Sequence, residues 1–282
     1  MRKFLRALWF APRPAFPYPL PYGGWTWVYP DENGIALLRG YSSEEGVWKF
    51  LRNYIKPNMT CVDVGACQGF YTMLFLKQLR GTGRVYAFEP VRTQREQLHR
   101  NLRLNRMQEV GLTLSPLAVS DEVGNAQLYI VPQHESRSSL NRPPAEVQEG
   151  SSTLSIDARS IGTTSLDEYL IDLHEIERLD ILKIDAEGAE YKILVGARRV
   201  LTDLRPVVVM EVADVTTREF GYPASRLVEF MENCGYSGYR VSSKGALTRV
   251  QKTEDSFRDT LLFLPSYRGQ VQMYQDAVRQ SV

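Results

Sequence analysis

The sequence predicts an α/β fold in which helices cover both faces of a mostly parallel β-sheet. From Thr60 onward, short apolar segments of strand length alternate with longer segments whose apolar residues recur at helical spacing. Two of the short segments, 179–184 and 207–212, are apolar almost throughout, as expected of strands that are buried on both faces. Strands that alternate with helices form βαβ units, and these units build parallel sheets.

The expected elements follow one another without an internal repeat. Strands are expected at 60–64, 84–88, 112–119, 127–131, 179–184, 207–212, 236–241 and 261–264. Helices are expected at 43–55, 69–79, 91–105, 189–201 and 224–233. A further helix should begin near Ser165, because Ser165 and Glu168 have the spacing of a capping box.

Three segments fall outside this pattern. Residues 12–30 are rich in proline and aromatic residues, which predicts an extended arm that is ordered only where its aromatic side chains find a surface. Residues 132–163 are polar and lack periodicity, which is typical of a functional lid or of a disordered loop. We therefore expect an arm over 1–42, a main domain over 43–265 with the lid 132–163 inserted in it, and a tail over 266–282.

The composition is that of an ordinary globular protein. The chain has 282 residues, of which 43% are hydrophobic and 24% charged, and its net charge of +1 gives no global attraction for nucleic acid. Three cysteines match neither a zinc site nor a disulfide framework, which indicates a cytoplasmic protein.

The apolar residues at the N-terminus are too few for a targeting or spanning segment. Arg6 interrupts them well before the roughly 7–15 apolar residues of a secretory signal. No segment approaches the roughly 20 apolar residues of a membrane span. Packing on the main domain, a homodimer contact and peripheral membrane contact remain as alternatives for this segment.

The most informative motif is the loop Asp63-Val64-Gly65-Ala66-Cys67-Gln68-Gly69, where a strand turns abruptly into a helix. Gly65 permits the turn, and Gly69 lets the helix start close to the sheet. Ligands of open α/β sheets bind at this edge. Cys67 replaces the fingerprint glycine that makes room for a dinucleotide's pyrophosphate, a group that S-adenosylmethionine lacks.

Several residues near this loop are expected to contact such a cofactor. Asp63 can accept from its ammonium, directly or through water, or can instead orient the loop. Glu89, 26 positions further on and at the end of a strand, can accept from both ribose hydroxyls. Asp121 can accept from the adenine amine. The other expected contacts are Gly65, Ala66, Gly69, Phe70, Tyr71, Pro90 and Ser120.

These motifs resemble the FkbM family of S-adenosylmethionine-dependent methyltransferases. The likeness covers about residues 43–264 and is most specific in Lys183-Ile184-Asp185-Ala186-Glu187-Gly188-Ala189-Glu190. It implies the class I methyltransferase fold, a Rossmann-like sheet of seven strands with an antiparallel last strand. It also implies an O-methyltransferase, a class that often acts on hydroxyls of sugars, natural products or lipids. Ser138, Ser139 and Leu140 match the serine-rich segment of the family, which implies that Ser139 contacts the cofactor. Cys67-Gln68 replaces the family's commoner Asn-Ile pair, a change that should leave cofactor binding intact.

The acceptor site is expected where the strand 179–184 ends. Asp185 can take the proton of an acceptor hydroxyl held near the methyl group, or can hold the cofactor's ammonium. Glu187 follows it, and Glu211 is a charged residue in an apolar strand that needs a cleft or a partner. Helix capping is the alternative for Asp185, Glu187 and Glu190. His134, in the lid, is a further candidate base.

Competing interpretations follow from the same residues. Asp185, Glu187, Glu211 and Asp214 can converge on Mg²⁺, but carboxylates at such edges are frequent without a metal, so we expect a metal-free reaction. A nucleic-acid N-methyltransferase would carry Pro-Pro-aromatic after position 185, and this chain does not. A nicotinamide dehydrogenase lacks support because the fingerprint glycine is missing. The intact loop argues against a non-catalytic binding protein. The expected partner is a small-molecule or glycan hydroxyl acceptor.

Overall fold

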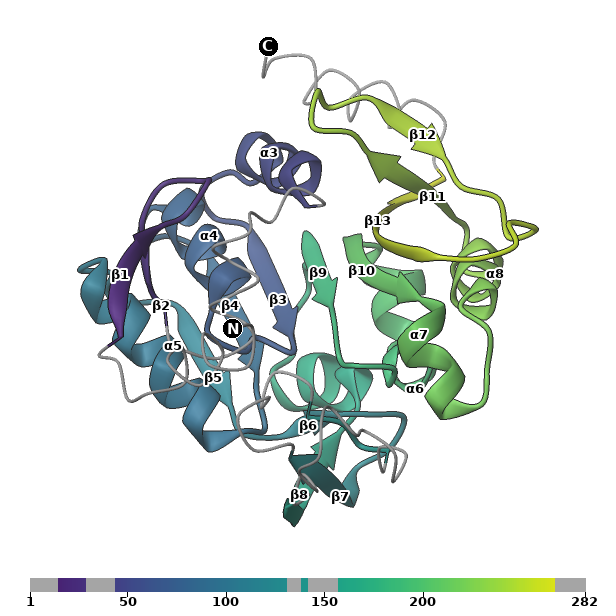
Figure 1. Cartoon of the computed structure of the whole chain (residues 1–282), viewed down its shortest axis with the longest axis horizontal. Helices are drawn as coiled ribbons and strands as arrows, with labels where there is room; N and C mark the ends of the chain where they lie inside the picture. The colour runs from purple at the N-terminus through teal and green to yellow at the C-terminus, as the bar shows by residue number, and fades with distance from the viewer. Residues whose placement is uncertain (1–14, 29–43, 131–137, 142–156, 267–282) are drawn as a thin grey trace, which may run out of the picture.

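A computed structural model describes residues 15–28, 44–130, 138–141 and 157–266 (Figure 1). Its main sheet has eight strands in the order β12-β11-β13-β10-β9-β3-β4-β5. The strands are β3 (Thr60–Val64), β4 (Arg84–Phe88), β5 (Leu112–Ser115), β9 (Ile181–Ile184), β10 (Val207–Ala213), β11 (Tyr236–Val241), β12 (Leu247–Arg249) and β13 (Arg258–Pro265).

The strand directions confirm the predicted fold class. The five strands from β5 to β10 are all parallel to their neighbours. The last strand of the sequence, β13, lies between β10 and β11 and is antiparallel to both. Seven strands therefore have the expected arrangement, and β12 adds an eighth at the edge by pairing with β11.

Helices cover both faces of this sheet (Figure 1). Alternate residues of the buried strands point to opposite faces, so Val62 and Val208 join one apolar cluster while Cys61 and Val209 join the other. The helical segments are α3 (Glu45–Tyr54), α4 (Phe70–Leu79), α5 (Arg92–Leu104), η2 (Asp167–Leu173), α6 (Glu190–Val195), η3 (Val200–Leu204), α7 (Asp214–Thr217), η4 (Arg218–Phe220) and α8 (Ser225–Asn233). No helix in the part of the chain that the structure describes is long and apolar enough to cross a membrane.

The single helix expected over 189–201 is wrong, because the structure divides it into α6 and η3. Gly196 lies between the two pieces, and a Cβ atom there would lie 2.3 Å from the carbonyl oxygen of Ser120. The backbone thus passes directly against the segment that follows β6.

A second, three-stranded sheet corrects two further predictions. It consists of β6 (Ala118–Val119), β7 (Gly124–Ile130) and β8 (Asp157–Thr164), with β8 in the middle. The expected strand 112–119 is divided between the two sheets, and 157–163 is a strand rather than part of a polar loop. The first four of the eight residues of β8 are exposed, and its sequence shows no apolar periodicity although its backbone pairs along all seven residues of β7. Segments 131–137 and 142–156 of the predicted lid lie outside the described residues.

The N-terminal segment is a hairpin of β1 (Phe16–Pro19) and β2 (Trp25–Val28), rather than an unpaired extended arm. It lies along α5, where Asn101 and Asn105 accept the backbone N–H groups of Trp27 and Trp25. Tyr22 between the strands is buried, and its hydroxyl donates to the carbonyl of Phe70 at 2.6 Å. Tyr22 has thus found the surface that ordering requires, whereas Phe16 and Trp25 remain exposed. The division between an arm and a main domain stays a prediction.

Candidate functional site

The loop between β3 and α4 turns as the sequence predicted. Gly65 has a φ of +73°, and a Cβ atom there would lie 1.8 Å from the carbonyl oxygen of Asp185. Gly69 has a φ of +89° and packs against Leu98. Because no other residue fits these two positions without strain, Gly65 lets the loop lie directly against the end of β9, and Gly69 lets α4 begin close to Leu98 of α5.

Glu89 is fixed at the end of β4 with both carboxylate oxygens aimed by backbone groups. Its Oε2 accepts the N–H of Cys67 at 2.8 Å, and its Oε1 accepts the N–H of Val91 at 2.7 Å. Each oxygen keeps a second lone pair, so the carboxylate can accept from two neighbouring hydroxyls. Burial raises the pKa of Glu89 to about 7, although the N–H donors of Val91 and Cys67 favour the charged form.

Asp63 lies inside the protein rather than on the loop surface, with an exposed fraction of 0%. Its Oδ2 accepts the Thr72 hydroxyl at 2.6 Å, and its Oδ1 lies 3.4 Å from Nζ of Lys183. Asp63 thus orients the loop through Thr72 and Lys183, and its contact with a cofactor ammonium, directly or through water, stays a prediction.

Lys183 is a buried cation that sequence reasoning did not assign to the site. Its ammonium donates to the carbonyl oxygen of Gly65 at 2.8 Å and lies 3.7 Å from Oδ2 of Asp185. Burial favours its neutral form, but the charges of Asp185 and Asp63 outweigh this effect and raise the pKa of Lys183. Lysine is rare among buried side chains, and its position inside an apolar strand was the available signal.

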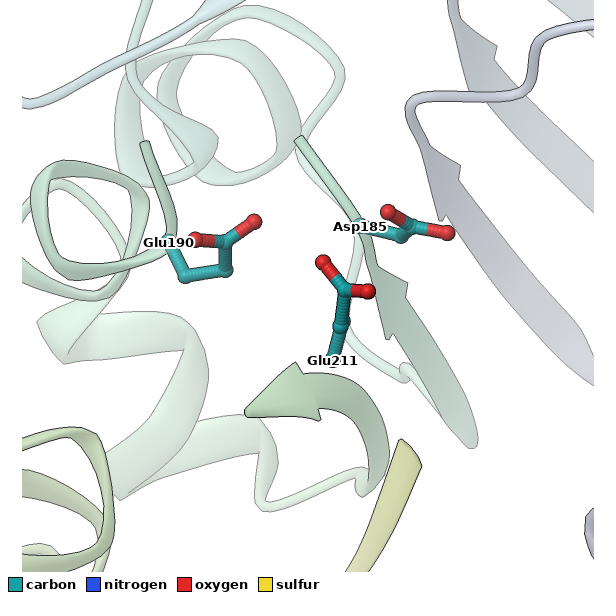
Figure 2. A group of neighbouring side chains, drawn as sticks. All are labelled: Asp185, Glu190 and Glu211. Atoms are coloured by element: carbon teal, nitrogen blue, oxygen red, sulfur yellow. The ribbon is translucent and has the colours of Figure 1, made fainter. Parts of the chain in front are cut away.

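The carboxylates of Asp185, Glu190 and Glu211 form a cluster (Figure 2). One carboxylate oxygen from each of Asp185, Glu190 and Glu211 lies within 4.8 Å of the other two. Parallel pairing of β9 with β10 sets Met210 opposite Ile184, so Glu211 and Asp185 follow at the same edge. Burial, and then the charge of Asp185, raise the pKa of Glu211 to about 9.

Glu190 combines the capping role with membership of this cluster. Its Oε1 accepts the N–H groups of Ala186 at 2.9 Å and of Gly188 at 3.2 Å, so it caps the turn before α6. The side chain is wholly buried, and burial raises its pKa to about 7. Sequence reasoning favoured the cap and did not place Glu190 beside Glu211.

The four carboxylates that the sequence offered for Mg²⁺ do not converge as a set. Asp214 accepts the N–H groups of Ala224 and Phe257 and lies 3.4 Å from Nε of Arg218, so it fixes chain segments beside β10. Glu187 is absent from the group of three among the described residues. Glu187 instead has a φ of +51° in the turn after β9, and its carbonyl accepts the Ser139 hydroxyl at 3.2 Å.

Glu44, which precedes α3, is a residue that sequence reasoning missed. Its Oε1 accepts the hydroxyl of Thr260 at 2.8 Å, and Thr260 pairs with Glu211 across β13 and β10. Burial, and then the charge of Asp185, raise the pKa of Glu44. No motif marks this glutamate, because only tertiary packing brings α3 to the acceptor edge.

The structure describes the remaining predicted site residues except His134. Ser120 is buried and donates to the exposed Asp121 at 2.8 Å. Ser139 is buried and pairs with Tyr129. His134 lies outside the described residues. Ala66 and Tyr71 are buried, whereas Phe70 and Pro90 are partly exposed. Contact of these residues with a cofactor stays a prediction.

The strand order, with β13 antiparallel between β10 and β11, and the glycine loop beside Glu89 define a class I methyltransferase fold. A family model for the methyltransferase FkbM domain matches residues 63–237, which is more than half of the chain. The chain therefore belongs to this family.

Individual relatives are more distant. Methyltransferase 1 of Beauveria bassiana is 27% identical over 165 residues, which cover 54% of this chain and 64% of that protein. Methyltransferase sdnD of Sordaria araneosa is 28% identical over 176 residues, which cover 56% and 67%. The chain thus spans about two thirds of the length of these relatives. A crystal structure of methyltransferase FkbM from Methylobacillus flagellatus has a TM-score of 0.45 and 17% identity, covering 73% of this chain and 43% of that one.

Proposed function

We propose that this protein is an S-adenosylmethionine-dependent O-methyltransferase that acts on a hydroxyl of a small molecule, sugar or natural product. The observation that carries the proposal is the position of Asp185, whose carbonyl packs on Gly65 of the loop and whose carboxylate lies with Glu211 and Glu190. One residue thus connects the expected cofactor loop to an acidic acceptor edge.

The residues present fit the proposed cofactor. Glu89 offers two oriented carboxylate oxygens, which suit the neighbouring hydroxyls of a ribose. The excess of carboxylates near the loop suits a ligand that carries a sulfonium and an ammonium. When bound, this cofactor supplies an electrophilic methyl group.

The chain's own contribution to the transfer is to place the acceptor hydroxyl and to remove its proton. Asp185 suits the second task, because its side chain is 41% exposed and faces the edge of the loop. In the metal-free protein, burial and the neighbouring carboxylates raise the pKa of Glu211 to about 9, so Glu211 is protonated at neutral pH and can donate a hydrogen bond rather than accept the proton. An acidic edge repels phosphate groups, which disfavours the alternative of a nucleic-acid substrate.

The proposal is tested in two steps. Titration calorimetry should show binding of S-adenosylmethionine and of its demethylated product by the purified protein. Methyl-labelled cofactor is then incubated with panels of sugars and hydroxylated metabolites, and label transfer is measured for the wild type and for Asp185→Asn. Failure to bind either form of the cofactor would refute the proposal. Transfer to nitrogen acceptors only would retain the cofactor and overturn the acceptor class.

A further inference from the structure

We propose that Asp185, Glu190 and Glu211 form a binding site for a divalent cation, Mg²⁺ or Mn²⁺, at the acceptor edge. Binding of the cation stands on the contacts of these three side chains. Its role in catalysis rests on the proposed function. The inference replaces the metal-free reaction that the sequence favoured, because the tertiary structure assembles a different set of carboxylates.

Three carboxylates from different segments converge at the acceptor edge. The three side chains come from the turn after β9, the start of α6 and the end of β10, and one oxygen of each lies within 4.8 Å of the others (Figure 2). Carboxylate oxygens are the ligands that Mg²⁺ and Mn²⁺ prefer.

Glu190 is a buried carboxylate with one unpaired oxygen. Its exposed fraction is 0%, and its Oε2 has no hydrogen-bond partner, whereas its Oε1 accepts two backbone N–H groups. Figure 2 shows its carboxylate turned toward Glu211. An unpaired oxygen in a buried carboxylate is costly unless a proton or a cation neutralises it.

Lys183 is a positive charge next to this cluster, and it pairs with Asp63 and Asp185. Lys183 lies 3.7 Å from Oδ2 of Asp185, and it also contacts Asp63, the carbonyl oxygens of Val64 and Gly65, and the ring of Tyr71. This lysine therefore compensates Asp63 and one side of Asp185, while Glu190 and Glu211 lie on the other side. A small ion can reach them from solvent, because Asp185 and Glu211 are both partly exposed.

A cation at this position would assist the proposed reaction directly. An acceptor hydroxyl that binds the ion is held in place, and the positive charge lowers its pKa. A ligand carboxylate next to that hydroxyl can then take the proton. The cation would favour acceptors with two neighbouring oxygens, such as a vicinal diol, because both oxygens can occupy open coordination positions.

The test measures Mn²⁺ binding to the full chain by electron paramagnetic resonance, without cofactor or acceptor. We expect one Mn²⁺ per chain, displaced by excess Mg²⁺. Glu190→Gln and Glu211→Gln should each weaken binding by about tenfold or more, since each removes one ligand charge. The control is Glu229→Gln, an exposed glutamate on α8 that lies 3.5 Å from Lys252, and it should bind as the wild type does. Circular dichroism verifies that each variant is folded.

Two outcomes would overturn the inference: no bound Mn²⁺ in the wild type, or undiminished binding in both cluster variants. If S-adenosylmethionine binding is lost in Glu190→Gln while Mn²⁺ never binds, the cluster holds the cofactor's ammonium instead. The proposed function is measured separately, by cofactor binding to the metal-free wild type. Cofactor binding without Mn²⁺ binding would therefore defeat the cation site alone, and Mn²⁺ binding without cofactor binding would defeat the proposed function alone.

Discussion

Replacement of Glu89 by glutamine tests the cofactor site most directly. Both oxygens of Glu89 are already aimed by backbone N–H groups at 2.8 and 2.7 Å. In Glu89→Gln one oxygen becomes an NH₂ group, which cannot accept a ribose hydroxyl and which faces a backbone donor. Loss of a hydrogen bond to a charged group costs about 1.5–3 kcal/mol, and we expect S-adenosylmethionine affinity to fall by roughly 12- to 160-fold.

The pH dependence supplies a second, independent measurement. The pKa of Glu89 is about 7 without ligand, and the ionised form is the one that accepts two hydroxyls. Affinity should therefore be nearly constant above pH 8 and about tenfold weaker at pH 6, because protonation must be reversed before binding. In Glu89→Gln this dependence should vanish.

Titration calorimetry at several pH values measures both effects. Glu96→Gln is the matched control, because Glu96 is an exposed residue of α5 that pairs with Arg92 at 2.9 Å. A thermal melt shows whether Glu89→Gln remains folded. Wild-type affinity in a folded Glu89→Gln protein, with the pH dependence unchanged, would refute the ribose assignment.

Three other predictions concern Asp63, Asp185 and Glu211. Asp63→Ala should lower the free energy of unfolding by up to about 3–5 kcal/mol in urea titrations, because it removes the closer of the two carboxylates beside the buried Lys183 and leaves only the partly exposed Asp185; an unchanged midpoint would argue against this pairing. Asp185→Asn should lower methyl transfer by more than about tenfold while the melting temperature stays near that of the wild type, since the shape is retained; full turnover would leave Asp185 only a structural role. Between about pH 8 and 9 the free energy of unfolding without ligands should fall by up to about 1.4 kcal/mol per pH unit, because burial raises the pKa of Glu211 from 4.5 to about 9, whereas Glu89 and Glu190, with pKa values of about 7, are already ionised there. Glu211→Gln should flatten this slope, and a steeper loss of stability toward acid would contradict the assignment.

The local elements of the fold could be predicted from the sequence because their causes are local. Apolar runs of strand length predicted β3 and β4 to the residue. The Gly65–Gly69 loop and Glu89 followed from requirements on backbone conformation and on strand ends. The hydroxyl of Ser165 accepts the N–H of Glu168 at 3.1 Å, as the capping motif predicted. Strand β8 escaped prediction because its side chains are polar and its order comes from backbone pairing with β7.

Tertiary structure alone decided how the charged residues of the site are grouped. The sequence placed Asp185 and Glu211 at one edge, since parallel strands end together, but it could not show that α6 brings Glu190 beside them while Asp214 fixes other segments. It also could not show that Lys183 joins Asp63 to Asp185, or that Glu44 reaches Thr260 across the sheet. Periodicity determines which face of a strand or helix is buried. Contacts between side chains far apart in the sequence depend on how those faces pack, and a single sequence carries no local signal for them.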